Sequence, residues 1–274
     1  MDAPVPGLNA GRLLAAMEEA ARTAGAFQLS QFRLRLPGWG ENKAGNEFVS
    51  FVDTESEKAI RLILEKAQPG AAFYGEETEQ SLGEGLTWVV DPLDGTTNFI
   101  SGFDYWAVSI ALWEGGAGPV MGLVYRPMTD EIFTALRGGG AYRNGIRLNQ
   151  AQPLALKSAL IATGTPYRSP DTMDSFFATV RRVMEVFHDL RRSGSAAIDL
   201  SYTAAGYLQG FWEVDLQPYD VAAGLLMLSE TGHRCSAFSG VPYDPFRHRS
   251  FVCARPGLME ALEEAVRLGY GNLE

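Results

Sequence analysis

The chain of 274 residues contains only two cysteines and lacks any apolar run of the length that a membrane span requires. A transmembrane helix needs about 20 apolar residues, whereas the longest candidates, such as residues 107–113, have the length of a strand. A cytoplasmic chain of this size needs no disulfide framework, so we interpret Cys235 and Cys253 as reduced core thiols. With one pair of cysteines and no CxxC sequence, there is also no cysteine metal motif. The N-terminus carries an acid and two prolines where a secretory signal has a basic start and an apolar core. We therefore predict a cytoplasmic protein without a membrane partner.

Positive charge and histidine are also scarce. The formal net charge is −10, and an acidic surface repels a phosphate backbone, which argues against nucleic acid as the main partner. A small anionic substrate is still compatible with this charge, provided that metal ions reverse the local field. The three histidines, His188, His233 and His248, are scattered, and no two are separated by three or four residues. We interpret them as structural or surface residues rather than as metal ligands.

The composition, with 46% hydrophobic and 20% charged residues, is typical of a folded globular protein. Apolar residues at helical spacing predict a long amphipathic helix over residues 9–36. Residues 47–53 alternate like a short strand, and a second helix is predicted to follow. Asp53 or Thr54 is its expected N-cap, and Glu57 is placed to close a capping box with Thr54.

From residue 71 to about 147 the pattern changes to five short strands, which are separated by turns rich in glycine and proline. The short connections predict an antiparallel sheet that is covered by the two preceding helices. After a loop at residues 149–157, strand and helix segments alternate. We therefore predict two halves, an α+β half over residues 1–150 that carries the metal-binding motifs and an α/β half over residues 151–274 that completes the active site.

Two carboxylates, Asp91 and Asp94, follow an apolar strand and flank Pro92 in the sequence WVVDPLDGTTN. Proline cannot donate a ladder hydrogen bond, so we expect the strand to end there. Strict alternation then fails, and the two carboxylates can converge with the carbonyl of Leu93 on one small volume. Oxygen ligands without nitrogen or sulfur are those that Mg²⁺ prefers, and a divalent ion also removes the repulsion between two neighbouring carboxylates.

The residues that follow, Gly95, Thr96 and Thr97, offer backbone N–H groups and hydroxyls in a turn. Such a turn can hold a phosphate group that bridges to the same metal ions. The spacing DxxDGT also excludes a haloacid-dehalogenase phosphatase, because that class needs DxDGT and Leu93 stands where its nucleophile would lie. An EF-hand is excluded by the same leucine at the third ligand position.

Further carboxylates occupy similar places. Glu76 and Glu77 follow the apolar strand at residues 71–74, and Asp220 stands at the start of an apolar helix. Taken singly, each of these residues, and each aspartate of the DxxD pair, can be a turn former, a helix cap or part of a solvated loop. Their joint occurrence favours a shared metal site, although the spacing alone does not demonstrate that they converge.

At these positions the sequence closely resembles the inositol monophosphatase family. The hallmark run WxxDPxDGTxNF is matched by Trp88, Asp91, Pro92, Asp94, Gly95, Thr96, Asn98 and Phe99. Four further blocks match in order, at residues 43–53, 75–77, 194–197 and 218–224. The resemblance covers nearly the whole chain.

The resemblance implies a layered αβαβα sandwich of the inositol monophosphatase and fructose bisphosphatase type, with α+β and α/β halves, and a magnesium-dependent hydrolysis of a phosphate monoester. It implies that two or three Mg²⁺ ions are held by Glu76, Asp91, the Leu93 carbonyl, Asp94 and Asp220. It assigns phosphate binding to Gly95, Thr96 and Thr97. It assigns catalysis to the metal ligand Glu76 and to Asp53 and Thr96, which would orient the attacking water. It assigns contacts with the substrate to Lys43, Gly194, Ser195, Ala196 and Glu213.

Four residues depart from the usual family pattern, namely Glu47, Ser50, Tyr219 and His233, and none of them removes a metal ligand. We therefore expect an active enzyme whose substrate is a small phosphorylated polyol or sugar, with inositol monophosphate as the first substrate to test. Alternatives within the class are fructose bisphosphate, histidinol phosphate and 3′-phosphoadenosine nucleotides. An alternative from another class is a non-catalytic regulatory module of RNA metabolism. The resemblance also implies a homodimer.

Overall fold

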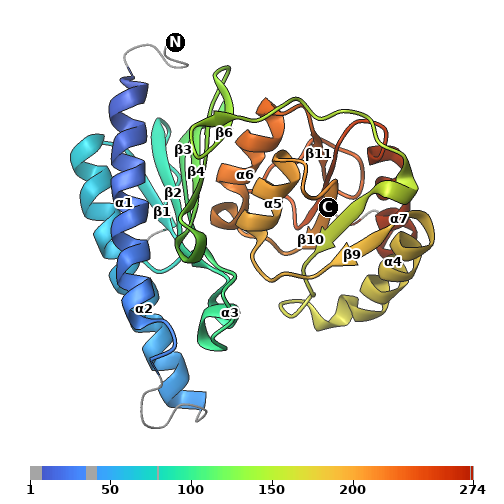
Figure 1. Ribbon diagram of the computed structural model, residues 1–274, viewed down its shortest axis with the longest axis horizontal. Coiled ribbons are helices and arrows are strands. Elements are labelled where there is room, and N and C mark those ends of the chain that lie inside the picture. The colour runs from blue at the N-terminus through green and yellow to red at the C-terminus, as the bar shows by residue number, and fades with distance from the viewer. Residues whose placement is uncertain (1–7, 35–41, 79, 272, 274) are drawn as a thin grey trace.

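The computed structural model describes residues 8–34, 42–78, 80–271 and 273, and over residues 42–50 it describes the backbone alone. Two helices, α1 (Ala10–Gln31) and α2 (Asn42–Ala67), lie side by side along one face of a seven-stranded sheet (Figure 1). The sheet has the order β1-β2-β3-β4-β5-β6-β7, in which β1 and β2 are parallel and every other pair is antiparallel. Its strands are β1 (Ala72–Gly75), β2 (Leu86–Asp94), β3 (Ala107–Glu114), β4 (Gly118–Arg126), β5 (Glu131–Leu136), β6 (Gly140–Arg143) and β7 (Ile146–Arg147).

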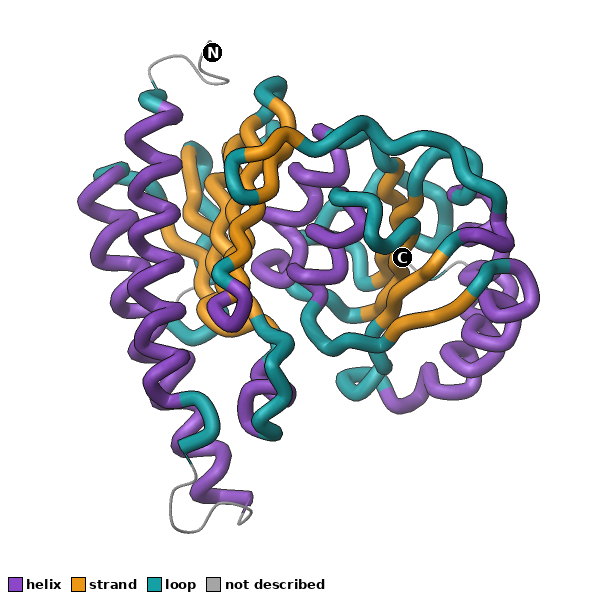
Figure 2. The backbone as a smooth tube through the Cα atoms, viewed as in Figure 1, coloured by secondary structure: helices purple, strands orange, loops and turns teal. Residues whose placement is uncertain are grey.

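The opposite face of this sheet is covered by α5 (Ala196–Ala204) and α6 (Pro218–Glu230), which separate it from a second sheet of five strands (Figures 1 and 2). The second sheet has the order β11-β12-β10-β8-β9, and α4 (Met173–Val186) and α7 (Met259–Tyr270) pack against each other on its far side. Its strands are β8 (Leu160–Thr163), β9 (Asp189–Arg191), β10 (Gly210–Val214), β11 (Arg234–Ser236) and β12 (Ser250–Ala254). The short elements are α3 (Thr96–Ile100) and the 3₁₀ turns η1 (Pro127–Thr129), η2 (Leu156–Ser158) and η3 (Pro170–Thr172).

The layers are therefore helix, sheet, helix, sheet and helix, as the resemblance implies, and the predicted fold class is confirmed. Strand β3 shows how the layers are joined. Val108 and Ile110 pack with the core beneath α1 and α2, while Ala107 and Ala111 pack with the core that contains α5 and α6. Both faces of this antiparallel strand are buried, because helices cover the sheet on both sides. The proposed division near residue 150 falls between the two sheets.

The short strand predicted over residues 47–53 is wrong, because these residues belong to α2. Val52, Ser56, Ile60 and Leu64 are all fully buried, and a spacing of four residues is the period of a helix face. An alternation over seven residues is too short to separate the two periods. The expected cap at Asp53 or Thr54 and the capping box with Glu57 are also wrong, since the helix begins at Asn42.

The end of the first helix also differs from the sequence pattern. The first helix ends at Gln31, before the predicted end at residue 36, which itself lies outside the described residues.

Both cysteines are free thiols, and Cys253 is fully buried. Among the helices of the described part of the chain, none has the length and apolarity needed to cross a membrane.

Candidate metal centre and active site

The two carboxylates of the DPLD sequence lie on a bulge of β2. Asp91 pairs with Ser109 of β3 and Asp94 pairs with Ala107, and the register shifts between them. Contrary to the prediction, the strand does not end at Pro92. Because proline has no N–H to donate, the ladder skips a residue there, and the bulge turns both carboxylates into one cavity.

The bulge is fixed by hydrogen bonds from its surroundings. The backbone N–H of Leu93 donates to Asp91 Oδ1 at 2.9 Å, and the hydroxyl of Thr96 donates to the Leu93 carbonyl at 3.0 Å. On the side of the helices, the fully buried Gln28 of α1 donates from Nε2 to the Pro92 carbonyl at 2.6 Å. The turn is thus tied to the first helix of the chain.

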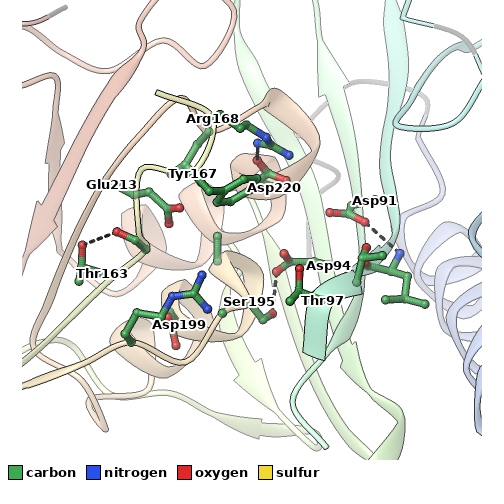
Figure 3. Close-up of a pocket in the computed structure, with 18 of the residues that line it drawn as sticks. Asp91, Asp94, Thr97, Thr163, Tyr167, Arg168, Ser195, Asp199, Glu213 and Asp220 are labelled. Atoms are coloured by element: carbon green, nitrogen blue, oxygen red, sulfur yellow. Dashed lines mark hydrogen bonds and ion pairs between the residues drawn. The ribbon is translucent and has the colours of Figure 1, made fainter. Parts of the chain in front are cut away.

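Asp220 reaches the same place from the N-terminus of α6. One carboxylate oxygen each from Asp91, Asp94 and Asp220 lie within 4.8 Å of one another, although the residues come from opposite halves of the chain (Figure 3). Asp220 also caps its helix, because the N–H of Gln217 donates to its Oδ2 at 2.7 Å. The cap and the shared acidic site are therefore both present.

Asp94 is held by the start of α5. Its Oδ2 accepts a hydrogen bond from the Ser195 hydroxyl at 2.6 Å (Figure 3) and another from the Ala197 N–H at 2.7 Å. Ser195 is also the N-cap of this helix. A carboxylate at a helix N-terminus is stabilised by the free N–H groups and the helix dipole, so α5 offsets part of the repulsion within the site.

Glu76 lines the same cavity but does not belong to the group of three within 4.8 Å. Its carboxyl group is in hydrogen-bond contact with Asp91. The loop that carries it is anchored by the fully buried Glu57 of α2, whose carboxylate accepts from the Glu77 N–H at 2.9 Å and from the Thr78 hydroxyl. Glu57 therefore positions the loop that carries Glu76. The sequence pattern around Glu57 did not indicate this role.

Asp53 lies beside this loop on α2 and is only 4% exposed. Its Oδ1 is buried and has no hydrogen-bond partner among the described residues. Burial and the charges of Glu77 and Glu76 raise the pKa of Asp53 to about 8. A buried carboxylate oxygen without a donor is costly, unless a water molecule or a cation satisfies it.

The carboxyl groups of the cavity oppose one another's ionisation. Burial and the charge of Asp220 raise the pKa of Asp94 to about 8 and that of Glu76 to about 7. The pKa of Asp91 lies well above its usual value because of burial and the charge of Glu76. These groups can be ionised together at neutral pH only if a positive charge enters. Because the atoms available as metal ligands are all oxygens, these residues fit a hard divalent cation.

The residues expected to bind phosphate line the cavity beside the carboxylates. Gly95 has a φ of +104°, and a Cβ at this position would lie 2.9 Å from the Tyr105 carbonyl, so the turn into α3 requires glycine. Thr96 and Thr97 begin that helix. Gly194, Ser195 and Ala196 also line the cavity, whereas the side chain of Lys43 lies outside the described residues. The roles assigned to these residues stay predictions.

The opposite wall of the cavity is built around Glu213 of β10 (Figure 3). Burial raises the pKa of Glu213 well above its usual value, and the charges of Asp220 and Asp199 add to this effect. The carboxylate packs directly on the backbone of Gly164, where a Cβ would overlap it. Glu213 is thus a buried acceptor that faces the carboxylate cluster across the cavity.

Sequence reasoning missed several residues of this wall, namely Thr163, Gly164, Tyr167, Arg168, Arg192, Asp199 and Leu216. Asp199 accepts a hydrogen bond from the Tyr105 hydroxyl at 2.9 Å and another from the Ser193 hydroxyl, and burial raises its pKa to about 7. The loop after β8 reaches the cavity because β8 and β10 are parallel neighbours whose carboxyl ends meet at one edge of the sheet, and this pairing is not visible in the sequence. The histidines do not contribute to the described lining of the cavity, and burial lowers the pKa of His233 to about 4.

The fold and the cavity define a member of a known class. A model of the inositol monophosphatase family matches residues 10–268, and the chain belongs to that family. It is 40% identical over 250 residues to the inositol-1-monophosphatase of Rhizobium meliloti (strain 1021), with 90% of each chain covered. It is 38% identical over 245 residues to the Nus factor SuhB of Salmonella typhimurium (strain 14028s / SGSC 2262), which covers 89% of this chain and 91% of the relative.

The same likeness appears among solved structures. The extragenic suppressor protein suhB from Bartonella henselae superimposes with a TM-score of 0.82 and 38% sequence identity, over 94% of this chain and 99% of that chain. Family membership and fold together support a phosphatase activity.

Proposed function

We propose that the protein is a Mg²⁺-dependent phosphomonoesterase and that inositol monophosphate is its most suitable substrate. The observation that carries the proposal is that Asp220, which is far away in sequence, converges with Asp91 and Asp94 within 4.8 Å. Four raised carboxyl pKa values around the same cavity support the requirement for a cation. Family membership supports the class of reaction.

The residues that would hold two or three Mg²⁺ ions are Glu76, Asp91, Leu93 through its carbonyl, Asp94 and Asp220. Bound Mg²⁺ supplies a water of lowered pKa and charge stabilisation for the phosphoryl and leaving-group oxygens. Ser195 and Ala197 donate to Asp94 and keep it in place for this task. Because the Ser195 hydroxyl is engaged in that bond, we assign Ser195 to the positioning of Asp94 as well as to the cavity wall.

The remaining residues of the site have roles that follow from their hydrogen-bonding capacity. The free Oδ1 of Asp53 can accept a hydrogen bond from the attacking water, and the Thr96 hydroxyl, which donates to the Leu93 carbonyl, can accept another. The backbone N–H groups at Gly95, Thr96 and Thr97 would hold the phosphate. On the opposite wall, Glu213 would accept a hydrogen bond from a hydroxyl of the alcohol.

The proposal is tested by measuring phosphate release from inositol monophosphate with Mg²⁺ and with EDTA. The variant Asp94→Asn keeps the size of the side chain but removes its charge, and we expect kcat to fall by about 100-fold or more. Asp174→Asn, at the exposed first turn of α4, is the matched control and should keep full activity. Full activity of Asp94→Asn, or activity that survives EDTA, would refute the site. Ranking fructose bisphosphate, histidinol phosphate and 3′-phosphoadenosine nucleotides by kcat/KM then distinguishes substrates within the class.

A second candidate function comes from the relative that is named Nus factor SuhB. Under this alternative the chain is a regulatory module of RNA metabolism. The net charge of −10 opposes direct RNA binding, and a module without catalysis has no use for several mutually repelling carboxylates. RNA binding at physiological salt together with an absence of phosphatase activity would favour it. The homodimer that the resemblance implies stays a prediction, which light scattering can check.

A further inference from the structure

The guanidinium group of Arg168 lies against the carboxylate cluster. Its Nη1 forms an ion pair with Asp220 Oδ2 at 3.4 Å (Figure 3). The same nitrogen donates to the Asp215 carbonyl at 3.2 Å. The charge of Glu76 also acts on this guanidinium. Arg168 thus places a fixed positive charge at the carboxylate through which α6 joins the cluster.

The loop that carries Arg168 is anchored, so the contact does not depend on one long side chain alone. The hydroxyl of Ser169, the next residue, donates to the carboxylate of Asp215. Arg249 donates to Asp215 Oδ1 at 2.6 Å and to the Ser169 hydroxyl at 3.1 Å. Asp215 itself has a φ of +61°, a conformation that non-glycine residues adopt only when their surroundings impose it. These contacts lock the β8 loop to the segment that leads into α6.

A guanidinium and a divalent cation that share one carboxylate repel each other. Asp220 Oδ2 is already shared between Arg168 and the N–H of Gln217. A divalent ion bound by Asp91, Asp94 and Asp220 would therefore have to displace the guanidinium or bind beside it at a cost. We propose that Arg168 is a positioning residue that competes with the divalent cation for Asp220 and so weakens metal binding at that position. This inference rests on the proposed metal-dependent function and adds to it a residue that sets the metal affinity.

The strength of the competition follows from the exposure of the pair. The side chain of Arg168 is 37% exposed while that of Asp220 is 8% exposed, so solvent screens the interaction in part. For such a pair we expect a change in metal affinity of about fivefold, which corresponds to about 1 kcal/mol. The direction of the change distinguishes competition from a structural role. If Arg168 competes with the metal ion, removal of its ion pair with Asp220 tightens metal binding.

The experiment is a titration of the full-length protein with Mn²⁺, in which electron paramagnetic resonance measures the concentration of free Mn²⁺. For Arg168→Gln and for Arg168→Met, we expect the apparent Kd for Mn²⁺ to fall about fivefold. For Arg168→Lys, which keeps the charge, the Kd should stay close to the wild-type value. A role of Arg168 in folding alone predicts weaker binding in all three variants, and thermal unfolding identifies any variant that has lost its structure.

Arg182→Gln is the matched control. Arg182 pairs with Glu185 at the same distance of 3.4 Å and is 42% exposed, but both residues lie on the surface of α4. Its loss should leave the Mn²⁺ affinity unchanged. Unchanged or weaker binding in both neutral Arg168 variants would overturn the competition. Failure of the wild-type protein to bind Mn²⁺ would instead overturn the proposed function, so the two failures are distinguishable.

Discussion

The stability of the metal-free protein should decrease as the pH rises from about 5 to 7.5. Asp53 illustrates the cause, because its pKa is raised from 3.8 to about 8 by burial and by the charges of Glu77 and Glu76. Between these two values, the unfolded chain has lost the proton of Asp53 while the native protein still binds it. Stability falls with pH wherever the native state binds more protons, so the contribution of Asp53 is complete below pH 3.8 and is lost as the pH approaches 8.

The magnitude follows from this proton count. One carboxyl group that is protonated only in the native state changes the free energy of unfolding by about 1.4 kcal/mol per pH unit, or about 3 kcal/mol between pH 5 and 7.5. Asp94, whose pKa is also raised to about 8, acts in the same direction. Since a domain is typically stable by only about 5–15 kcal/mol, an effect of this size is easily measured.

The assay is urea unfolding in EDTA at several pH values between 5 and 7.5, repeated with saturating Mg²⁺. Mg²⁺ should reduce the pH dependence, because the carboxylates that hold it are ionised in the native state as well. Asp53→Asn should reduce the slope in EDTA by about 1.4 kcal/mol per pH unit, whereas the exposed Asp174→Asn should leave it unchanged. A stability that rises with pH in EDTA, or a slope that Asp53→Asn does not alter, would refute the reasoning.

Two further predictions concern positions that support the site. Gly164→Ala would place a methyl group against the Glu213 carboxylate, so we expect KM for inositol monophosphate to rise about tenfold while the Mn²⁺ affinity is unchanged; an unaltered KM would contradict this role of Glu213. Glu57→Ala leaves the Glu77 N–H without its acceptor, so we expect a loss of about 2 kcal/mol in stability and weaker Mn²⁺ binding, whereas Glu55→Ala at an exposed ion pair should have neither effect. Unchanged Mn²⁺ binding in Glu57→Ala would show that the Glu76 loop does not depend on this anchor.

The metal-binding side of the cavity was predictable because its residues interrupt a pattern. Asp91 and Asp94 end an apolar run on either side of a proline, and Asp220 is the acid in the first turn of a largely apolar helix. A carboxylate in such a place needs a reason, and a shared cation supplies one. The geometry of the bulge was not predictable, since the sequence does not show whether a proline ends a strand or only shifts its register.

The opposite wall was not predictable in the same way. Arg168 and Asp199 are ordinary polar residues in a loop and at the start of a helix, and no spacing marks them. The position of the Arg168 loop depends on the parallel pairing of β8 with β10, which brings together residues about 50 positions apart. Asp199 is placed by α5 and by the hydroxyls of Tyr105 and Ser193. Glu57 illustrates a false prediction. Its spacing from Thr54 matches a capping box, although both residues lie inside a longer helix.

The carboxylates of this site are held together by groups that lie outside the motif itself. Each of the three clustered aspartates accepts a hydrogen bond from its own support, namely Leu93 N–H for Asp91, the start of α5 for Asp94 and Gln217 N–H for Asp220. Without these donors, mutual repulsion would push the carboxylates into separate positions or keep them protonated. The supports come from both halves of the chain, so the cavity exists only where the two sheets meet across α5 and α6. A substitution that shifts α5 by a fraction of a hydrogen-bond length would therefore change the metal site, even though α5 supplies none of the proposed ligands.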